Sequence, residues 1–292
     1  MTSVKEKAAA KINLYLDVVG KRPDGFHDIK SIMHTVDLSD ELTVSASPAK
    51  ENDIKLFVSG VELLPVDEKN LAVRAARLYV ERAGINAKIR IRLDKTIPVS
   101  AGLAGGSADA AATLRALNRL YGHFTERALA ELAAELGSDV PFCLVRGTAL
   151  CEGRGEIITR LPSPEKMYFV IAVANERVST PEAYGALDKL YSDFDGSVLS
   201  SGGELLAAQL SKIADGKINP SALYNAFEDV VLPECDGARR IKSRLVSLGA
   251  MSALMSGSGP SVFGIFASAE QARTAAEKLA EEGVRAYFAA SL

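Results

Sequence analysis

The sequence predicts a mixed α+β protein with two domains, over residues 1–160 and 161–292. Segments in which apolar and polar residues alternate, as in strands, are interleaved with segments of helical periodicity in both halves of the chain. The chain has 292 residues, of which 48% are hydrophobic, enough for two ordinary domains. The pattern changes around the proline-containing stretch LPSPEK (161–166), where we place the domain boundary.

Charge and composition narrow the class of protein. With 34 basic and 37 acidic residues, the net charge is −3, which gives no general attraction to nucleic acid or anionic membranes. The N-terminus lacks the apolar segment of a signal peptide, and the longest apolar stretches, such as residues 167–174, are shorter than a membrane span. The three cysteines and three histidines are scattered and predict neither a disulfide framework nor a metal cluster. We therefore expect a cytoplasmic protein, either a monomer or a homodimer.

Strands open the first domain. Residues 8–19 alternate, with Ile12 and its apolar neighbours on one side and Lys11 and Asn13 on the other, which predicts a half-buried strand. The RPDG sequence at 22–25 is typical of a turn, and a second strand follows it. Further strands are predicted over 41–47, 53–60 and 87–94.

Helices and a hairpin complete the first domain. A helix over 71–84 is predicted to end at Gly84. Another covers roughly 107–121, after a glycine-rich loop. A third covers 125–137, with Thr125 as N-cap and Gly137 as stop. The segment 147–161 predicts a hairpin that turns at its GRG sequence.

The second domain alternates strands and helices in the same way. A glycine-containing turn at 255–261 is expected between two short strands, and a mobile loop at 196–204. The other elements are predicted strands at 167–174 and 285–289 and helices near 181–191, 203–214, 237–248 and 268–282.

The glycine-rich loop precedes a helix in the sequence PVSAGLAGGSADAAATL (98–114). The first N–H groups of a helix have no partner within it, and the helix dipole adds partial positive charge, so the loop predicts an anion site. Gly102, Gly105 and Gly106 would let the backbone approach a phosphate. The loop has no GK[ST] sequence and no GxGxxG spacing, which excludes the two best-known phosphate motifs. A tight connection with glycines for close packing is the alternative.

The stretch PVSAGLAGGSADAAA resembles the phosphate-binding motif of the GHMP kinases (galactose, homoserine, mevalonate and phosphomevalonate kinases), whose pattern is close to PxxxGLGxSSA. AKINLYLDV near the N-terminus and MSGSGPSVFGIF near the C-terminus resemble the other two family motifs, in the family's order. The resemblance implies an N-terminal ATP-binding domain related to a ribosomal-protein fold and a C-terminal ferredoxin-like domain. It also implies phosphoryl transfer from ATP with Mg²⁺.

The resemblance assigns ATP-binding roles to the glycine loop and to two other places. Asn70 matches a position near the adenine, with an ordinary helix N-cap as the alternative. The third motif, Ser256, Gly257, Ser258 and Gly259, would line the cleft near the phosphates, with a plain hairpin turn as the alternative. The loop residues implied in ATP binding are Pro98, Val99, Ser100, Ala101, Gly102, Leu103, Ala104, Gly105, Gly106 and Ser107.

The loop departs from the family pattern at two positions. Ala104 stands where many members have Gly, and Ala108 stands where many have a second Ser. One hydroxyl that could hold the metal or a phosphate is therefore missing. The protein ligand of Mg²⁺ is left open.

The resemblance also implies the catalytic pair. Asp139 would accept the proton of the attacking hydroxyl, and Lys11 would be the cation near the transferred phosphoryl group. The residues by themselves allow a plainer interpretation. Asp139 then caps a helix, and Lys11 is a solvated charge on a strand.

Three further stretches, 10–32, 137–156 and 178–184, resemble the branch of the family that phosphorylates the 2-hydroxyl of a cytidine diphosphate conjugate of a methylated tetritol. This resemblance implies that His27 hydrogen-bonds the cytosine edge and that Phe26 and Tyr184 stack on its two faces. Asn13 and Thr180 are candidate polar contacts to the substrate. Without the resemblance, the two aromatic residues would be assigned to the core and His27 to the core or surface.

Three other functions remain as alternatives. A homoserine or mevalonate type of small-alcohol kinase would share the fold, but a substrate without a base needs no aromatic stack. A nucleic-acid-binding module is disfavoured by the negative charge and the lack of a basic, aromatic-laced stripe. A non-catalytic nucleotide sensor is disfavoured because Lys11 and Asp139 are both present.

Overall fold

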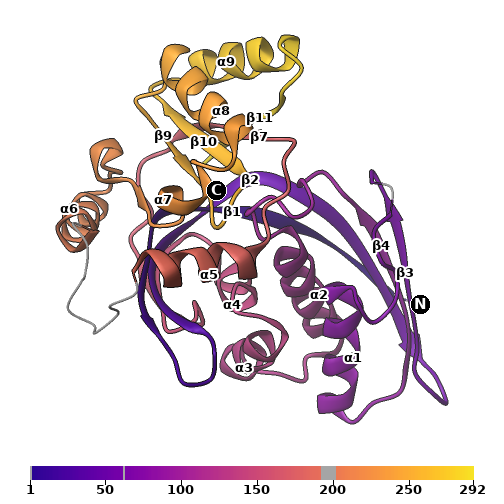
Figure 1. Cartoon of the computed structure of the whole chain (residues 1–292). Coiled ribbons are helices and arrows are strands. Elements are labelled where there is room, and N and C mark those ends of the chain that lie inside the picture. Colours follow the sequence, from indigo (N-terminus) through magenta and orange to yellow (C-terminus); the bar gives the residue numbers. More distant parts are fainter. Residues whose placement is uncertain (1, 62, 192–201) are drawn as a thin grey trace. The chain divides into compact units, whose positions relative to one another are not determined.

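The computed structural model describes residues 2–61, 63–191 and 202–292, and their contacts form two compact units (Figure 1). Each unit is discontinuous in sequence. Unit 1 contains Met1–Ala10, Leu38–Val99 and Ala104–Arg146, and unit 2 contains Lys11–Asp37, Ser100–Leu103 and Gly147–Leu292. The long strands β1 (Thr2–Lys21) and β2 (His27–Pro48) each contribute residues to both units. The mixed α+β prediction is confirmed, since helices and strands alternate along the chain.

In unit 1, helices pack on one face of a sheet (Figure 1). Strand β4 (Ala87–Asp94) pairs in parallel with β3 (Asp53–Ser59) and antiparallel with β2 from Glu41 to Pro48. Alternate residues of β4 are buried, as expected for a strand with one covered face. The helices of this unit are α1 (Leu71–Ala83), α2 (Gly105–Tyr121), α3 (Glu126–Leu136) and α4 (Val140–Val145).

The helix ends in unit 1 follow local chemistry. Asn70 caps α1 by accepting a hydrogen bond from Ala72 N at 2.9 Å, and Gly84 ends it with a left-handed φ of 63°. Thr125 caps α3 as predicted, accepting from Ala128 N. The short helix α4 was not predicted, because its six residues are too few to show a helical period.

Strand β2 is one continuous strand, whereas the sequence predicted separate strands interrupted before residue 41. The stretch between the two predicted strands, VDLSD (36–40), contains two aspartates. Both aspartates have partners in the structure. Asp37 accepts a hydrogen bond from Ala290 N at 2.7 Å within unit 2, and Asp40 pairs with Lys95 within unit 1. Their polar groups are satisfied, so the strand continues.

The first sheet region of unit 2 contains the predicted hairpin, with β5 (Thr148–Glu152) and β6 (Ile157–Leu161) turning at GRG. Strand β5 pairs antiparallel with residues 31–34 of β2. The two-residue strand β8 (Tyr224–Asn225) pairs in parallel with β1 at Tyr15 and Leu16.

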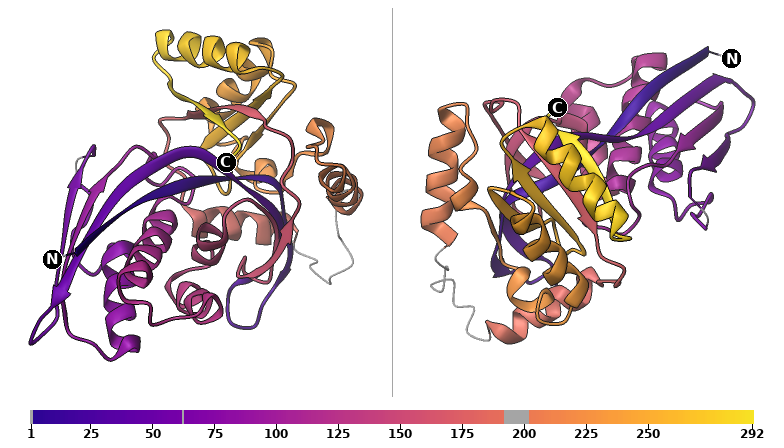
Figure 2. Two further views of the ribbon diagram at one scale, coloured as in Figure 1. Left: turned by 180° about the vertical axis from the view of Figure 1, so that it is seen from behind. Right: turned by 90° about the horizontal axis from the view of Figure 1, so that it is seen from above.

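The second sheet of unit 2 is antiparallel and has the order β11-β7-β10-β9. Helices α8 (Asp236–Ser247) and α9 (Ala269–Glu281) lie on one face of it (Figure 2). With α8 after β7 and α9 after β10, this order is the split βαβ arrangement of a ferredoxin-like domain. The strands are β7 (Tyr168–Val173), β9 (Ser252–Met255), β10 (Ser261–Phe266) and β11 (Arg285–Ala290).

The remaining elements of unit 2 lie between β7 and α8 in sequence. They are α5 (Thr180–Leu190), α6 (Gly202–Ala214), a 3₁₀ turn (Pro220–Ala222) and α7 (Glu228–Val231). The predicted mobile loop at 196–204 lies outside the described residues up to 201, and its last three residues begin α6.

Candidate active site

The polar side of β1 is buried, which corrects the prediction of a half-buried strand. Lys11 is 4% exposed and Asn13 is 1% exposed. Asn13 Oδ1 accepts hydrogen bonds from Lys11 Nζ at 2.7 Å and from Gly257 N at 3.0 Å, and its Nδ2 donates to Ser31 Oγ at 2.8 Å. The plain interpretation of Lys11 as a solvated strand charge is therefore wrong. Asn13 holds the ammonium group at a defined place inside unit 2.

The third-motif loop, residues 256–259, joins β9 to β10 and also contacts β1 through Gly257. Asn225 fixes this loop, because its Nδ2 donates to the carbonyl oxygens of Met255 and Gly257 at 2.7 and 2.8 Å. Ser258 Oγ shares a hydrogen bond of 2.8 Å with Thr180 Oγ1. The loop is thus a turn between strands and a bridge between the first motif and α5. Asn225 was not predicted as a site residue, because its local sequence has no feature that marks this role.

Part of the glycine loop meets the other two motifs within unit 2. Ser256 Oγ donates to Gly102 O at 3.1 Å, and Lys11 N donates to Leu103 O at 3.2 Å. Gly102 has a φ of 77°, and a Cβ at this position would lie 2.1 Å from Ser256 O. The close-packing role considered for the glycines therefore applies to Gly102. All three sequence motifs contribute to one hydrogen-bonded cluster.

The rest of the glycine loop begins α2 in unit 1, two residues earlier than predicted. Gly105, Gly106 and Ser107 form its first turn, and Ala104 at the N-cap has no side-chain oxygen to cap it. The N–H groups of this turn can therefore receive an anion. Ala104 has a φ of 56°, a left-handed conformation that favours glycine.

A buried cluster of charges lies beneath the start of α2, and sequence analysis missed it. Lys95 Nζ lies 2.5 Å from Asp40 Oδ2 and 3.0 Å from Asp109 Oδ2. Asp40 Oδ1 also accepts from two backbone N–H groups that follow Lys95. A Cβ on Gly105 would lie 3.1 Å from Lys95 Nζ, so the cluster packs directly under the loop. Burial raises the pKa of Asp109 to about 8; Lys95 acts to lower this pKa and the neighbouring Asp40 carboxylate acts to raise it.

Asp139 immediately precedes α4 and is partly buried. Its backbone carbonyl accepts from Cys143 N at 3.0 Å, while its carboxylate makes no capping hydrogen bond to that helix. Asp139 therefore occupies the N-cap position of α4, as the plainer interpretation expected, but its side chain does not cap the helix. Asn70, in contrast, is the N-cap of α1, and its Nδ2 also donates to Pro65 O at 2.8 Å.

The residues predicted to bind cytosine lie in unit 2. The His27 ring stacks on Tyr184, with centroids 4.6 Å apart and an angle of 18° between the planes. His27 Nε2 lies 2.7 Å from Asp188 Oδ1. Phe26 is 52% exposed, so its assignment to the core is wrong, and the Arg154 guanidinium lies 5.0 Å from its ring centroid.

Two general features bear on the class of protein. Among residues 2–61, 63–191 and 202–292, no three His, Cys, Asp or Glu side chains are grouped so that they could hold a metal ion. In the same part of the chain, every helix is too short or too polar to cross a membrane.

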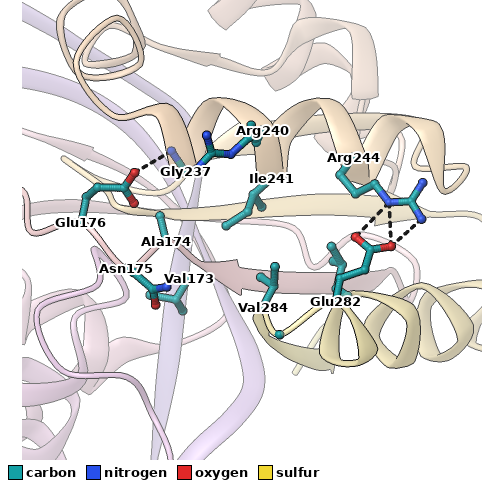
Figure 3. Close-up of a pocket in the computed structure, with 12 residues that line it drawn as sticks. Val173, Ala174, Asn175, Glu176, Gly237, Arg240, Ile241, Arg244, Glu282 and Val284 are labelled. Atoms are coloured by element: carbon teal, nitrogen blue, oxygen red, sulfur yellow. Dashed lines mark hydrogen bonds and ion pairs between the residues drawn. The ribbon is translucent and has the colours of Figure 1, made fainter.

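A cavity of about 450 Å³ lies elsewhere in unit 2, between α8, the end of β7 and the end of α9 (Figure 3). Its apolar lining includes Val173, Ile241 and Val284. At one end Glu176 accepts a hydrogen bond from Gly237 N, and at the other Arg244 pairs with Glu282 (Figure 3). None of the site residues predicted from the sequence lines this cavity.

The architecture and the three joined motifs define a class of protein. The models of the GHMP kinases N terminal domain and of the GHMP kinases C terminal match residues 70–147 and 206–285. The chain belongs to the GHMP kinase family. Membership implies the use of ATP in phosphoryl transfer, as the sequence motifs predicted.

Its similarity to one branch of the family extends over nearly the whole chain. It is 44% identical over 280 residues to the 4-diphosphocytidyl-2-C-methyl-D-erythritol kinase of Caldicellulosiruptor saccharolyticus, covering 94% of this chain and 91% of that one. It is 41% identical over 284 residues to the enzyme of that name from Gloeobacter violaceus, covering 97% and 92%.

Solved structures of two family members are similar to the chain. A crystal structure of 4-(cytidine 5′-diphospho)-2C-methyl-D-erythritol kinase matches with a TM-score of 0.80 and 34% identity, covering 98% of both chains. The homoserine kinase of Cytophaga hutchinsonii matches with a TM-score of 0.70 and 22% identity, which shows a shared fold.

Proposed function

We infer that the protein is an ATP-dependent kinase that phosphorylates the 2-hydroxyl of 4-diphosphocytidyl-2-C-methyl-D-erythritol, a step of non-mevalonate isoprenoid precursor biosynthesis. The products are the 2-phosphate and ADP. The observation that carries this inference is the cluster in which Asn13 links Lys11 to the third-motif loop, while Thr180 links that loop to α5, the helix that carries Tyr184. The names of the relatives that span over nine-tenths of the chain support it.

ATP would bind with its phosphates at the glycine loop. The fit of this loop to phosphate rests on the first turn of α2, whose N–H groups are not capped by the Ala104 side chain. The proposed loop contacts are residues 98–107, with Asn70 near the adenine and residues 256–259 lining the phosphate cleft. Mg²⁺ would supply charge neutralisation, and few protein ligands would be needed to hold it. Ser107 offers a hydroxyl in the first turn of α2, and the ligand is otherwise left unassigned.

Phosphoryl transfer forms a bond between the substrate 2-oxygen and the γ-phosphorus and breaks the bond from that phosphorus to the β,γ-bridging oxygen. Asp139 would accept the hydroxyl proton. Lys11 would stabilise the charge on the transferred group. Its ammonium is pre-positioned because Asn13 Oδ1 holds it at 2.7 Å.

The cytidine part of the substrate would be bound by residues around α5. An exposed Phe26 ring is available for stacking, and Tyr184 lies beside His27. Asn13 and Thr180 would contact the polar part of the substrate. A homoserine or mevalonate type of substrate lacks the base that would use these aromatic groups. We also propose that the protein is cytoplasmic and that its two domains cover residues 1–160 and 161–292.

Phosphorus NMR with Mg²⁺-ATP tests the proposal. We expect a new phosphomonoester signal with 4-diphosphocytidyl-2-C-methyl-D-erythritol and none with homoserine or mevalonate. Asp139→Asn should lose at least about a thousandfold in kcat, within the range expected for a general base assisted by positioning. Asp215→Asn, at an exposed position, is the matched control. Turnover of homoserine or mevalonate alone would overturn the substrate, and full activity of Asp139→Asn would overturn the base.

A further inference from the structure

His27 is held by two side chains of the same helix. Tyr184 stacks on its ring at 4.6 Å, and Asp188 Oδ1 lies 2.7 Å from its Nε2. Tyr184 and Asp188 are four residues apart on α5, so they project from the same face of the helix. The His27 side chain is 8% exposed. Stacking fixes the plane of the imidazole, and the carboxylate fixes its rotation in that plane.

The carboxylate also determines where the imidazole carries its proton. An ionised carboxylate only accepts hydrogen bonds, so Nε2 must be the protonated nitrogen, and in a neutral imidazole Nδ1 is then an acceptor. Lys21 Nζ lies 2.5 Å from the second oxygen of Asp188. Burial acts to raise the pKa of Asp188, but the hydrogen bonds from Lys21 and His27 outweigh it and hold that pKa below its usual value. Asp188 is therefore ionised near neutral pH.

We propose that Asp188 is a positioning residue that determines base specificity: by binding Nε2–H of His27, it leaves Nδ1 as an acceptor for the 4-amino group of cytosine. This inference rests on the proposed cytidine substrate. Uracil carries a 4-oxo group in place of the 4-amino group. His27 Nδ1, an acceptor, would then face the uracil 4-oxo oxygen, which is also an acceptor. Such a mismatch discriminates more strongly than a missing contact, because neither group is then hydrogen-bonded.

A merely structural role for Asp188 makes a different prediction. In that case its ion pair with Lys21 would tie α5 to the end of β1, and any variant that breaks the pair would have the same effect. Lys21→Met breaks the pair but leaves the contact between Asp188 and His27. Asp188→Asn keeps the shape and a hydrogen bond, but its amide can present either oxygen or NH₂ to Nε2. The imidazole can then adopt the other tautomer, with Nδ1–H as a donor.

The test compares wild type, Asp188→Asn and Lys21→Met with the cytidine substrate and its uridine counterpart at pH 8. We expect the cytidine-to-uridine ratio of kcat/KM to fall at least about tenfold in Asp188→Asn, as expected for an unmatched buried hydrogen bond. The change should lie in KM, since the contact is made in the bound ground state. Lys21→Met should keep the wild-type ratio, as should Glu182→Gln, an exposed carboxylate on the same helix. An unchanged ratio in Asp188→Asn, or an equal loss in Lys21→Met, would overturn the proposal.

Nitrogen NMR of the His27 ring gives a readout that does not depend on turnover. Wild type should show the Nε2–H tautomer, and Asp188→Asn should show a mixture. An Nδ1–H tautomer in wild type would overturn the proposal even if the enzyme is active. The expected tautomer together with no turnover of either nucleotide would instead contradict the proposed function and leave the positioning role of Asp188 supported.

Discussion

Gly102 is a residue at which the glycine loop contacts the third motif within unit 2. Its carbonyl accepts a hydrogen bond from Ser256, and its φ of 77° lies in the left-handed region. The space that a side chain would need is already occupied by the Ser256 carbonyl, 2.1 Å from an ideal Cβ. The residue therefore combines a conformational requirement with a steric one.

Gly102→Ala should lower the free energy of unfolding by about 2–5 kcal/mol, from left-handed strain of ~1–2 kcal/mol and overpacking of ~1–3 kcal/mol. Urea denaturation measures this loss. Gly106→Ala is the stability control, because its Cβ would meet its nearest neighbour at 3.7 Å and its φ is not positive. An equal loss in both variants would show that the steric argument is wrong.

Ala104 is the opposite case, because it has a side chain at a position where the backbone conformation favours glycine. Its φ is 56°, and the same position is glycine in many members of the family. Ala104→Gly should raise the free energy of unfolding by about 0.5–1 kcal/mol, because relief of strain exceeds the entropy that glycine adds to the unfolded chain. A lower melting temperature for this variant would contradict the strain.

At the scale of the elements, α1 begins at a residue with two possible roles. Asn70 caps the helix through its oxygen, while its NH₂ group donates to Pro65 O. Asn70→Ala should cost about 1–2 kcal/mol of stability through loss of the cap. Asn70→Asp keeps the capping oxygen and should retain most of that stability. If Asn70 also contacts the adenine, Asp should still raise the KM for ATP; an unchanged KM would leave the cap as its role.

Strand β2 and helix α2 are joined beneath the start of α2 by the Asp40–Lys95–Asp109 cluster, in which Lys95 directly follows β4. Burial raises the pKa of Asp109 to about 8 in the folded state, so the folded protein binds more protons than the unfolded chain between about pH 4 and 8. The contribution of Asp109 to the free energy of unfolding is therefore fully present below pH 4 and is lost as the pH rises towards 8. Denaturation from pH 5 to 8 should show a smaller decline in Asp109→Asn than in wild type. Parallel curves would contradict this assignment.

At the scale of the whole molecule, the C-terminal residues are tied to β2 within unit 2. His34 hydrogen-bonds Thr148 Oγ1 at 2.8 Å and Ser291 Oγ at 3.0 Å, and Leu292 N donates to Thr35 O. Burial lowers the pKa of His34 from 6.5 to about 4. The imidazole is therefore neutral in the fold and becomes protonated on acid unfolding.

Because the folded pKa of His34 is depressed, its contribution to stability is present above pH 6.5 and is lost as the pH falls towards 4. The loss amounts to roughly 3 kcal/mol, from about 1.4 kcal/mol per pKa unit. In His34→Gln this part of the acid dependence should disappear, so the stability difference between wild type and variant should shrink from pH 7 to 4. A constant difference over that range would show that His34 does not remain neutral in the fold.

The sequence alone determined the local elements, the order of the three motifs and, through them, the family. Helices α1 and α3, the hairpin at GRG and the strands of the ferredoxin-like sheet follow from periodicity, caps and turn residues, all of which act over a few positions. Roles could be assigned to the motif residues because each motif is a short, continuous segment that can be compared with the family's pattern. Helix α4 was too short for such a signal, and β2 is one strand where two were predicted.

Only the tertiary structure decided which polar groups meet. Asn13 contacts Gly257 across 244 positions of sequence, His27 contacts Asp188 across 161, and Lys95 reaches Asp40 across 55. A buried polar side chain is tolerated only where a partner satisfies it, and the sequence near that side chain does not identify a partner so far along the chain. For that reason the alternation of β1 showed which residues share a face but not that this face is buried.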